Sequence, residues 1–138
     1  MPKPMAVSLM RKLLLIGALA FTMAIGIGSL IHAPVILEEA TKNSDKLIHA
    51  TAYFFFCLFW FTYLYWAGMR ERKFKTVLTI AVGWSLFFGM VIEILQGELT
   101  TYRTGDFLDM VANTTGVVLA VLVLNMSKSS LNRIKENF

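Results

Sequence analysis

The fold class is decided by residues 13–31, which read LLLIGALAFTMAIGIGSLI and contain no charged side chain. A helix needs about 20 apolar residues to cross the hydrocarbon core of a bilayer, so this run is long enough to cross once. Three further apolar runs follow, at residues 47–67, 74–95 and 107–126. We therefore predict an all-α membrane protein, a bundle of four transmembrane helices that forms a single domain over residues 1–138.

The overall composition agrees with this prediction and excludes several other classes of protein. Apolar residues make up 57% of the chain and charged residues only 16%, whereas an average soluble domain carries about 25% charged residues. This shortfall excludes a disordered tail and disfavours a soluble globular domain. The single cysteine, Cys57, excludes a disulfide within the chain, and no Cys/His spacing is typical of a zinc finger.

The positions of the basic residues predict the orientation in the membrane. Ten of the 13 Lys and Arg residues lie in the N-terminal tail, in residues 70–75 and in the C-terminal tail. Four crossings put these three segments on one side, and short cytoplasmic loops are enriched in Lys and Arg. We therefore predict a multi-pass membrane protein with both termini in the cytoplasm. This distribution explains the net charge of +4 without a nucleic-acid partner. Residues 70–75 are interpreted mainly as a topology signal, with contact to anionic lipid as the alternative.

The first apolar run also has some features of a signal peptide. It follows Arg11 and Lys12, and Ile31-His32-Ala33 resembles a cleavage site. The run is nevertheless longer than the 7–15 residues or so of a typical signal-peptide core, so we predict that it is retained as a helix.

Polar residues gather at the ends of three spans that this topology places on the outer side. Asp45, His49 and Tyr53 are each four residues apart, which puts them on one face of a helix. Asp106, Asp109 and Asn113 form a similar stripe that leads into the fourth span. The complete predicted cluster comprises Asp45, Lys46, His49, Tyr53, Glu93, Gln96, Arg103, Asp106, Asp109 and Asn113.

Ionisable groups at this depth are expected to face one another rather than the lipid. A charge exposed to lipid at the bilayer centre costs about 2.5–3.5 kcal/mol, and such residues usually lie in cavities or functional sites. Carboxyl groups gathered with an imidazole must pair, take up protons or bind a cation. The inner halves of the spans are largely apolar, which argues against a channel and predicts a dead-end pocket open to the outer side.

The ordered set of polar motifs resembles the VanZ-like family of small integral membrane proteins from bacteria. The resemblance rests on Asp45-Lys46-x-x-His49-x-x-x-Tyr53, Glu93-x-x-Gln96, Arg103 and Asp106-x-x-Asp109-x-x-x-Asn113-x-x-Gly116, and it covers about residues 44–123. The family's namesake is associated with resistance to the glycopeptide antibiotic teicoplanin. The resemblance implies a location in the bacterial cytoplasmic (inner) membrane and a role in the cell envelope, which by analogy would be of the glycopeptide-resistance type. It implies no particular reaction.

Three interpretations of the cluster remain open. In the first, the pocket binds an extracytoplasmic ligand such as a lipid-linked or cell-wall precursor head group, with Lys46 and Arg103 on its phosphate or carboxylate. In the second, the protein is a metal-assisted hydrolase or transferase acting on a lipid head group. Its divalent cation would be held by Asp45, His49, Glu93 and Asp109. In the third, the cluster only fixes helix packing. The sequence contains no H-E-x-x-H, G-x-S-x-G or P-loop motif, and it specifies neither catalysis nor the oligomeric state.

Overall fold

The computed structural model of the chain describes residues 4–30, 44–68, 71–99 and 107–136. Its long helices are α1 (Pro4–Leu30), α3 (Asp45–Tyr63), α4 (Phe74–Leu99) and α5 (Phe107–Glu136), and a π-helical turn, η1 (Leu64–Gly68), continues α3. Four helical segments are long and apolar enough to cross a membrane. The predicted all-α membrane fold with four spanning helices is confirmed.

The helices extend beyond the apolar runs that predicted them. α5 in particular continues past residue 126 as far as Glu136. Its last turn carries Arg133 and Lys135, whose positive charges interact favourably with the carbonyl end of a helix. Hydropathy locates the part of a helix that lies in lipid, whereas hydrogen bonding and charge continue the helix into the aqueous phase.

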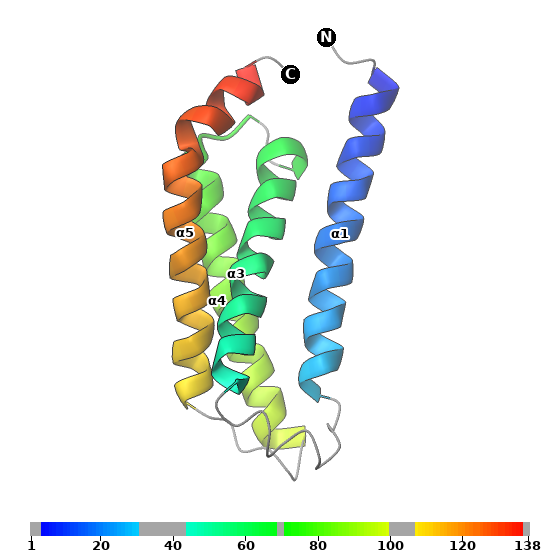
Figure 1. Cartoon of the computed structure of the whole chain (residues 1–138). Helices are drawn as coiled ribbons and strands as arrows, with labels where there is room; N and C mark the ends of the chain where they lie inside the picture. Colours follow the sequence, from blue (N-terminus) through cyan, green and yellow to red (C-terminus); the bar gives the residue numbers. More distant parts are fainter. Residues whose placement is uncertain (1–3, 31–43, 69–70, 100–106, 137–138) are drawn as a thin grey trace.

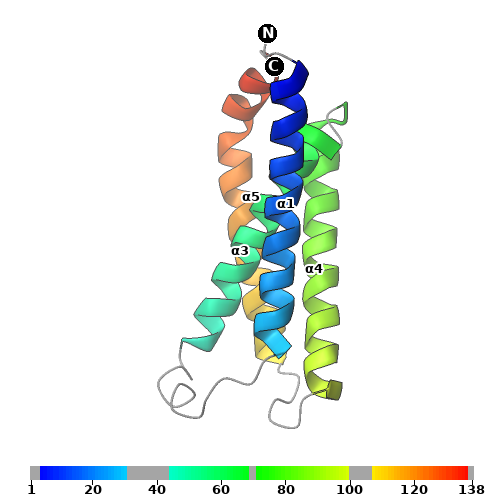
Figure 2. The same cartoon turned by 90° about the vertical axis from the view of Figure 1, so that its right-hand side faces the viewer.

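The helices run up and down side by side, and successive helices point in opposite directions (Figure 1). α3 has its most extensive contacts with α5, while α1 lies at the periphery and is the least buried of the four (Figures 1 and 2). The N-terminal end of α1 and the C-terminal end of α5 lie at the same end of the bundle. This agrees with an even number of crossings, while the cytoplasmic location of the termini stays a prediction.

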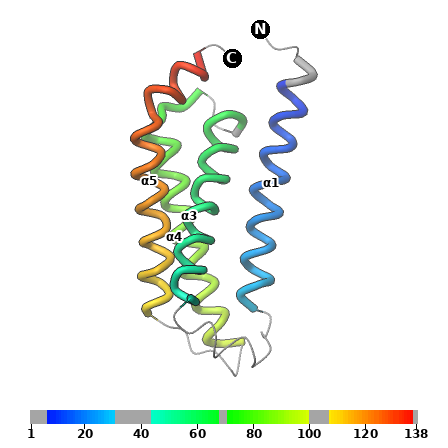
Figure 3. Tube along the Cα trace, in the orientation of Figure 1, coloured from blue at the N-terminus to red at the C-terminus, as the bar shows by residue number. Residues whose placement is uncertain are grey.

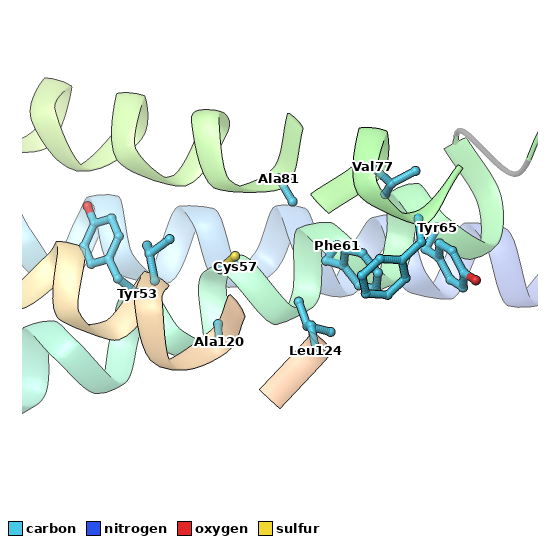
Figure 4. Close-up of a cluster of buried hydrophobic side chains, with 10 residues drawn as sticks. Tyr53, Cys57, Phe61, Tyr65, Val77, Ala81, Ala120 and Leu124 are labelled. Atoms are coloured by element: carbon cyan, nitrogen blue, oxygen red, sulfur yellow. The ribbon is translucent and has the colours of Figure 1, made fainter. Parts of the chain in front are cut away.

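One face of α3 supplies both the core and the polar site, because its residues repeat every four positions. Tyr53, Cys57, Phe61 and Tyr65 are each at most 1% exposed and pack against α4 and α5. Figure 4 shows this row among small and branched side chains of α4 and α5, namely Val77, Ala81, Ala120 and Leu124. The same row continues toward the start of α3 through His49 and Asp45, so it changes from apolar to polar at Tyr53.

Two glycines let the helices approach closely around the polar end of this row. A Cβ atom on Gly116 of α5 would collide with the backbone carbonyl oxygen of Ala50 in α3, and a Cβ on Gly89 of α4 would lie 3.1 Å from Cε1 of Tyr53. Gly17, Gly26, Gly28 and Gly83 have no such neighbour within 4 Å. Close helix contact in membranes favours small residues, and here Gly116 brings the N-terminal halves of α3 and α5 together.

Candidate functional site

The candidate site lies where the first turns of α3 and α5 meet. Asp45 and His49 occupy successive turns of α3, and Asp109 and Asn113 occupy successive turns of α5. The four-residue spacing in each helix directs both polar pairs toward the interhelical contact. His49, Asp109 and Asn113 are buried, whereas Asp45 lies half-buried at the rim.

Three potential metal ligands converge at this contact. His49 Nε2 lies 3.9 Å from Asp45 Oδ1 and 3.7 Å from Asp109 Oδ2. One ligand atom from each of the three residues lies within 4.8 Å of the other two. Two atoms bound to one cation at about 2.1 Å can be at most about 4.2 Å apart, so small side-chain movements would let all three coordinate an ion.

Asn113 fixes the orientation of the His49 ring. His49 Nδ1 lies 3.0 Å from Asn113 Oδ1, and because a carbonyl oxygen only accepts, Nδ1 carries the proton and donates. In the neutral imidazole this leaves the lone pair on Nε2, directed toward the two carboxylates. Histidine ligands of metals usually donate their other ring nitrogen to an oxygen in this way.

Lys46 supplies one positive charge beside these acceptors. Its Nζ lies 3.5 Å from Asp109 Oδ1, and its side chain is 44% exposed, so the ammonium group also reaches the outside of the bundle. Two carboxylates and an imidazole lone pair gathered in a mostly buried space repel one another. One lysine offsets part of this repulsion, and a bound cation would offset the remainder.

Tyr53 lies one turn further along α3 than His49, and Glu93 of α4 lies near it. Glu93 is 6% exposed and close enough to interact electrostatically with the Tyr53 hydroxyl. Among the described residues, the group that could hold a metal contains Asp45, His49 and Asp109 and does not include Glu93. Glu93 was predicted as a fourth ligand, and this role stays a prediction.

Two buried hydrogen-bond donors close to His49 lack partners in the described part of the chain. They are the Tyr53 hydroxyl and the Asn113 side-chain nitrogen. A buried polar group usually has a hydrogen-bond partner from the protein or from ordered water. A water molecule or a ligand group below His49 would satisfy both.

Three residues of the predicted cluster are still to be placed, namely Gln96, Arg103 and Asp106. Gln96 is 2% exposed, and its Nε2 donates to the Ser29 carbonyl oxygen of α1 at 2.9 Å, so this side chain joins α4 to α1. Arg103 and Asp106 lie outside the described residues. Their predicted contacts therefore stay predictions.

The sequence analysis left α1 out of the site, but α1 forms one wall of a cavity that reaches it. This cavity has a volume of about 350 Å³ and lies between α1 and α3. Asp45 and His49 line it together with Phe21, Ala24, Ile25 and Gly28. The α1 residues that line the cavity are three or four positions apart, as expected for one face of a helix. The span at residues 13–31 is uncharged all round, so its sequence does not tell the face that lines a cavity from the face that contacts lipid.

Comparison with known proteins places the chain in a family. The sequence model of the VanZ/LLP1 family matches residues 6–128, which include α1. The chain belongs to the VanZ/LLP1 family. The predicted resemblance is thus confirmed, and the VanZ/LLP1 region takes in all four spanning helices of the bundle.

One curated relative of this VanZ/LLP1 chain comes from a fungus. It is described as "Uncharacterized protein C11E3.10" of Schizosaccharomyces pombe, and it is 39% identical over 80 residues, which are 58% of this chain and 46% of the relative. The chain therefore aligns with about half the length of this relative. The bacterial origin of the chain stays a prediction. No solved structure matches the chain.

Proposed function

We propose that this VanZ/LLP1 protein binds the phosphate-bearing head group of a membrane lipid, such as a lipid-linked cell-wall precursor, through a divalent cation. The cation would be held by Asp45, His49 and Asp109 at the outer face of the membrane. The observation that carries this proposal is the His49 ring, whose Nδ1 is engaged by Asn113 while its Nε2 lies between two carboxylates. Such a set of nitrogen and oxygen donors suits Zn²⁺ or Mn²⁺.

The surroundings of the three ligands support a lipid rather than a water-soluble ligand. The cavity beside Asp45 and His49 has walls made mainly of apolar side chains from α1 and α3. An acyl or polyprenyl chain could occupy this space while its head group stays at the polar end. Lys46 lies at the same end, where its ammonium group can contact a phosphate oxygen as a point charge.

Metal binding by the purified protein tests the first half of the proposal. We expect about one Zn²⁺ or Mn²⁺ per chain in detergent solution, measured by mass spectrometry and isothermal titration, because three ligands converge. Asp109→Asn should weaken binding by about tenfold or more. Glu98→Gln is the matched control, since Glu98 is an exposed carboxylate on α4. Equal affinity in both variants and the unmodified protein would rule out this site.

Lipid binding tests the second half. We expect the metal-loaded protein to bind a polyprenyl phosphate more tightly than the matching polyprenol, because only the phosphate can contact the cation and Lys46. Lys46→Gln should reduce this preference, and removal of the metal with a chelator should abolish it. If the phosphate and the alcohol bound equally well with metal present, the proposed head-group contact would be wrong.

Metal-assisted hydrolysis or transfer of the head group is the second candidate function. It is favoured by the number of ligands, because catalytic zinc sites commonly have three protein ligands and keep another position open for water or substrate. A cation held by Asp45, His49 and Asp109 would supply activation of water and of the phosphoryl oxygens. The water oxygen would form a bond to phosphorus while the bond from phosphorus to the lipid alcohol or phosphate oxygen breaks, and the proton released by the water would pass to that leaving oxygen. Metal-dependent release of a phosphorylated product from a lipid diphosphate, lost in Asp109→Asn, would establish catalysis. Binding without product release would leave the protein a binding protein.

A further inference from the structure

The end of the bundle that carries both termini holds a second cavity. Its volume is about 510 Å³, and it lies between the loop before α4, the start of α4 and the last turns of α5. Five cations line this cavity, namely Arg72, Lys73, Lys75, Lys128 and Lys135. Among the described residues of the lining, Glu136 is the one carboxylate. We propose that this basic cavity binds a phosphate group, separately from the site at the other end of the bundle.

The π-helical turn at the end of α3 contributes one residue to the lining of the basic cavity. This turn carries Tyr65, which is 1% exposed and donates from its hydroxyl to Asn132 Oδ1 at 2.6 Å. The bond fixes the end of α3 against α5, so the lining residues of both helices keep a defined spacing. π-helical turns often occur at functional positions.

Aromatic rings and backbone carbonyls hold the lysines of this cavity in place. Lys135 Nζ lies 4.1 Å from the centre of the Tyr65 ring and donates to the Arg72 carbonyl oxygen at 3.3 Å. Lys128 Nζ lies 5.6 Å from the centre of the Phe74 ring. Cation–π contacts and carbonyl acceptors position a positive charge without neutralising it.

The positive charge of the cavity therefore remains available to an anion. Within the ranges that the structure describes, Arg72, Lys73, Lys75 and Lys128 have no carboxylate within 4.0 Å. Like charges around one cavity repel one another, and a phosphate with up to two negative charges would relieve this repulsion. The positive-inside rule explains the number of cations at this membrane face, but it does not require them to surround one cavity.

The basic cavity is distinct from the metal-ligand cluster. Asp45 and Asp109 lie in the first turns of α3 and α5, whereas the cavity is lined by Tyr65, which follows the end of α3, and by the last turns of α5. Figures 1 and 3 show that the starts and the ends of these two helices lie at opposite ends of the bundle. A phosphate group at this level can come from an anionic lipid of the adjacent leaflet or from a soluble phosphate compound. Both sources present the same oxygens to the lysines.

Binding measurements on the full chain test this proposal and separate the two sources. In the lipid arm, native mass spectrometry counts the phosphatidic acid molecules that stay bound after detergent exchange. In the soluble arm, isothermal titration measures the affinity for inorganic pyrophosphate. We expect Lys73→Gln/Lys128→Gln to lower retention or affinity by about tenfold or more. The control Lys12→Gln/Arg133→Gln removes the same charge from exposed positions outside the cavity and should change either value by less than about twofold.

Each outcome has a defined meaning for the basic cavity. If Lys73→Gln/Lys128→Gln, but not the control, loses binding in the lipid arm alone, the ligand is a lipid head group. If it loses binding of pyrophosphate in the soluble arm, the ligand is a soluble phosphate compound. Equal loss in both double variants, or no binding in either arm, would overturn the proposal. Circular dichroism and thermal unfolding of both variants verify that the bundle is intact, and Zn²⁺ binding at the other end should be unchanged in both.

Discussion

At the scale of single residues, His49 determines what the outer site can do. Its Nδ1 is committed to Asn113, and its Nε2 faces Asp45 and Asp109. A histidine that only stabilised helix packing could point either nitrogen at any acceptor. Here, in the neutral imidazole, Nδ1 donates to Asn113 and the lone pair of Nε2 faces two carboxylates. Metal-binding histidines with an orienting partner have this arrangement.

Asn113→Leu tests this interpretation of His49. Loss of the Oδ1 acceptor leaves the imidazole free to rotate and to change tautomer, so we expect Zn²⁺ affinity to fall by about 10–100-fold. Asn113→Asp keeps an acceptor at the same position and should retain most of the affinity. Isothermal titration in the same detergent compares the two variants, and wild-type affinity in Asn113→Leu would contradict the orienting role.

At the scale of helices, the contact between α3 and α5 assembles the site. Gly116, in the third turn of α5, lies against the backbone of Ala50 and Phe54, in the second and third turns of α3. His49 is next to Ala50 in α3, and Asn113 lies one turn before Gly116 in α5. Any added volume at Gly116 therefore separates the polar residues as well as the helices.

Gly116→Ala is expected to destabilise the bundle and to weaken the site together. Overpacking of a tight contact costs about 1–3 kcal/mol, so the apparent Tm in detergent should fall by several degrees and Zn²⁺ affinity should fall with it. Gly83→Ala is the control, because no atom lies within 4 Å of an added Cβ at Gly83. It should leave both values unchanged or raise the Tm slightly, since alanine favours helix. Equal effects of the two substitutions, by circular dichroism, would contradict this account.

At the scale of the whole molecule, the bundle separates two polar regions by an apolar core. The metal-ligand cluster lies at one end, the basic cavity lies at the other, and the row from Tyr53 to Tyr65 packs between them (Figure 4). Lipid surrounds the outer surface of this core, where many large apolar side chains are exposed. Within the described residues, buried apolar side chains therefore separate the two regions for which binding is proposed.

Reporter fusions test the predicted orientation. A fluorescent protein that folds only in the cytoplasm should be active when fused to the C-terminus or inserted after residue 70. Alkaline phosphatase, which needs the outer compartment, should be active when inserted in residues 32–43 or 100–106. This pattern follows from the excess of Lys and Arg in the predicted cytoplasmic segments. The reverse pattern would place the basic cavity outside and would invalidate the proposed orientation of both sites.

The sequence alone determined the number of spanning helices and the polar faces of α3 and α5. Apolar length predicts a span because an unpaired backbone cannot lie in lipid, and four-residue spacing puts Asp45, His49 and Tyr53 on one face whatever their partners are. The chemistry of the individual site residues could therefore be predicted, although their function stays a proposal.

Only the tertiary structure decided which faces meet. It joined Asp109 and Asn113 to His49, placed Glu93 beside Tyr53, and brought α1 to the cavity wall. It also gathered lysines of the 70–75 segment and of α5 around one cavity. The physical reason is that periodicity fixes directions within one helix, whereas contact between helices depends on how their surfaces fit, as at Gly116 and Ala50.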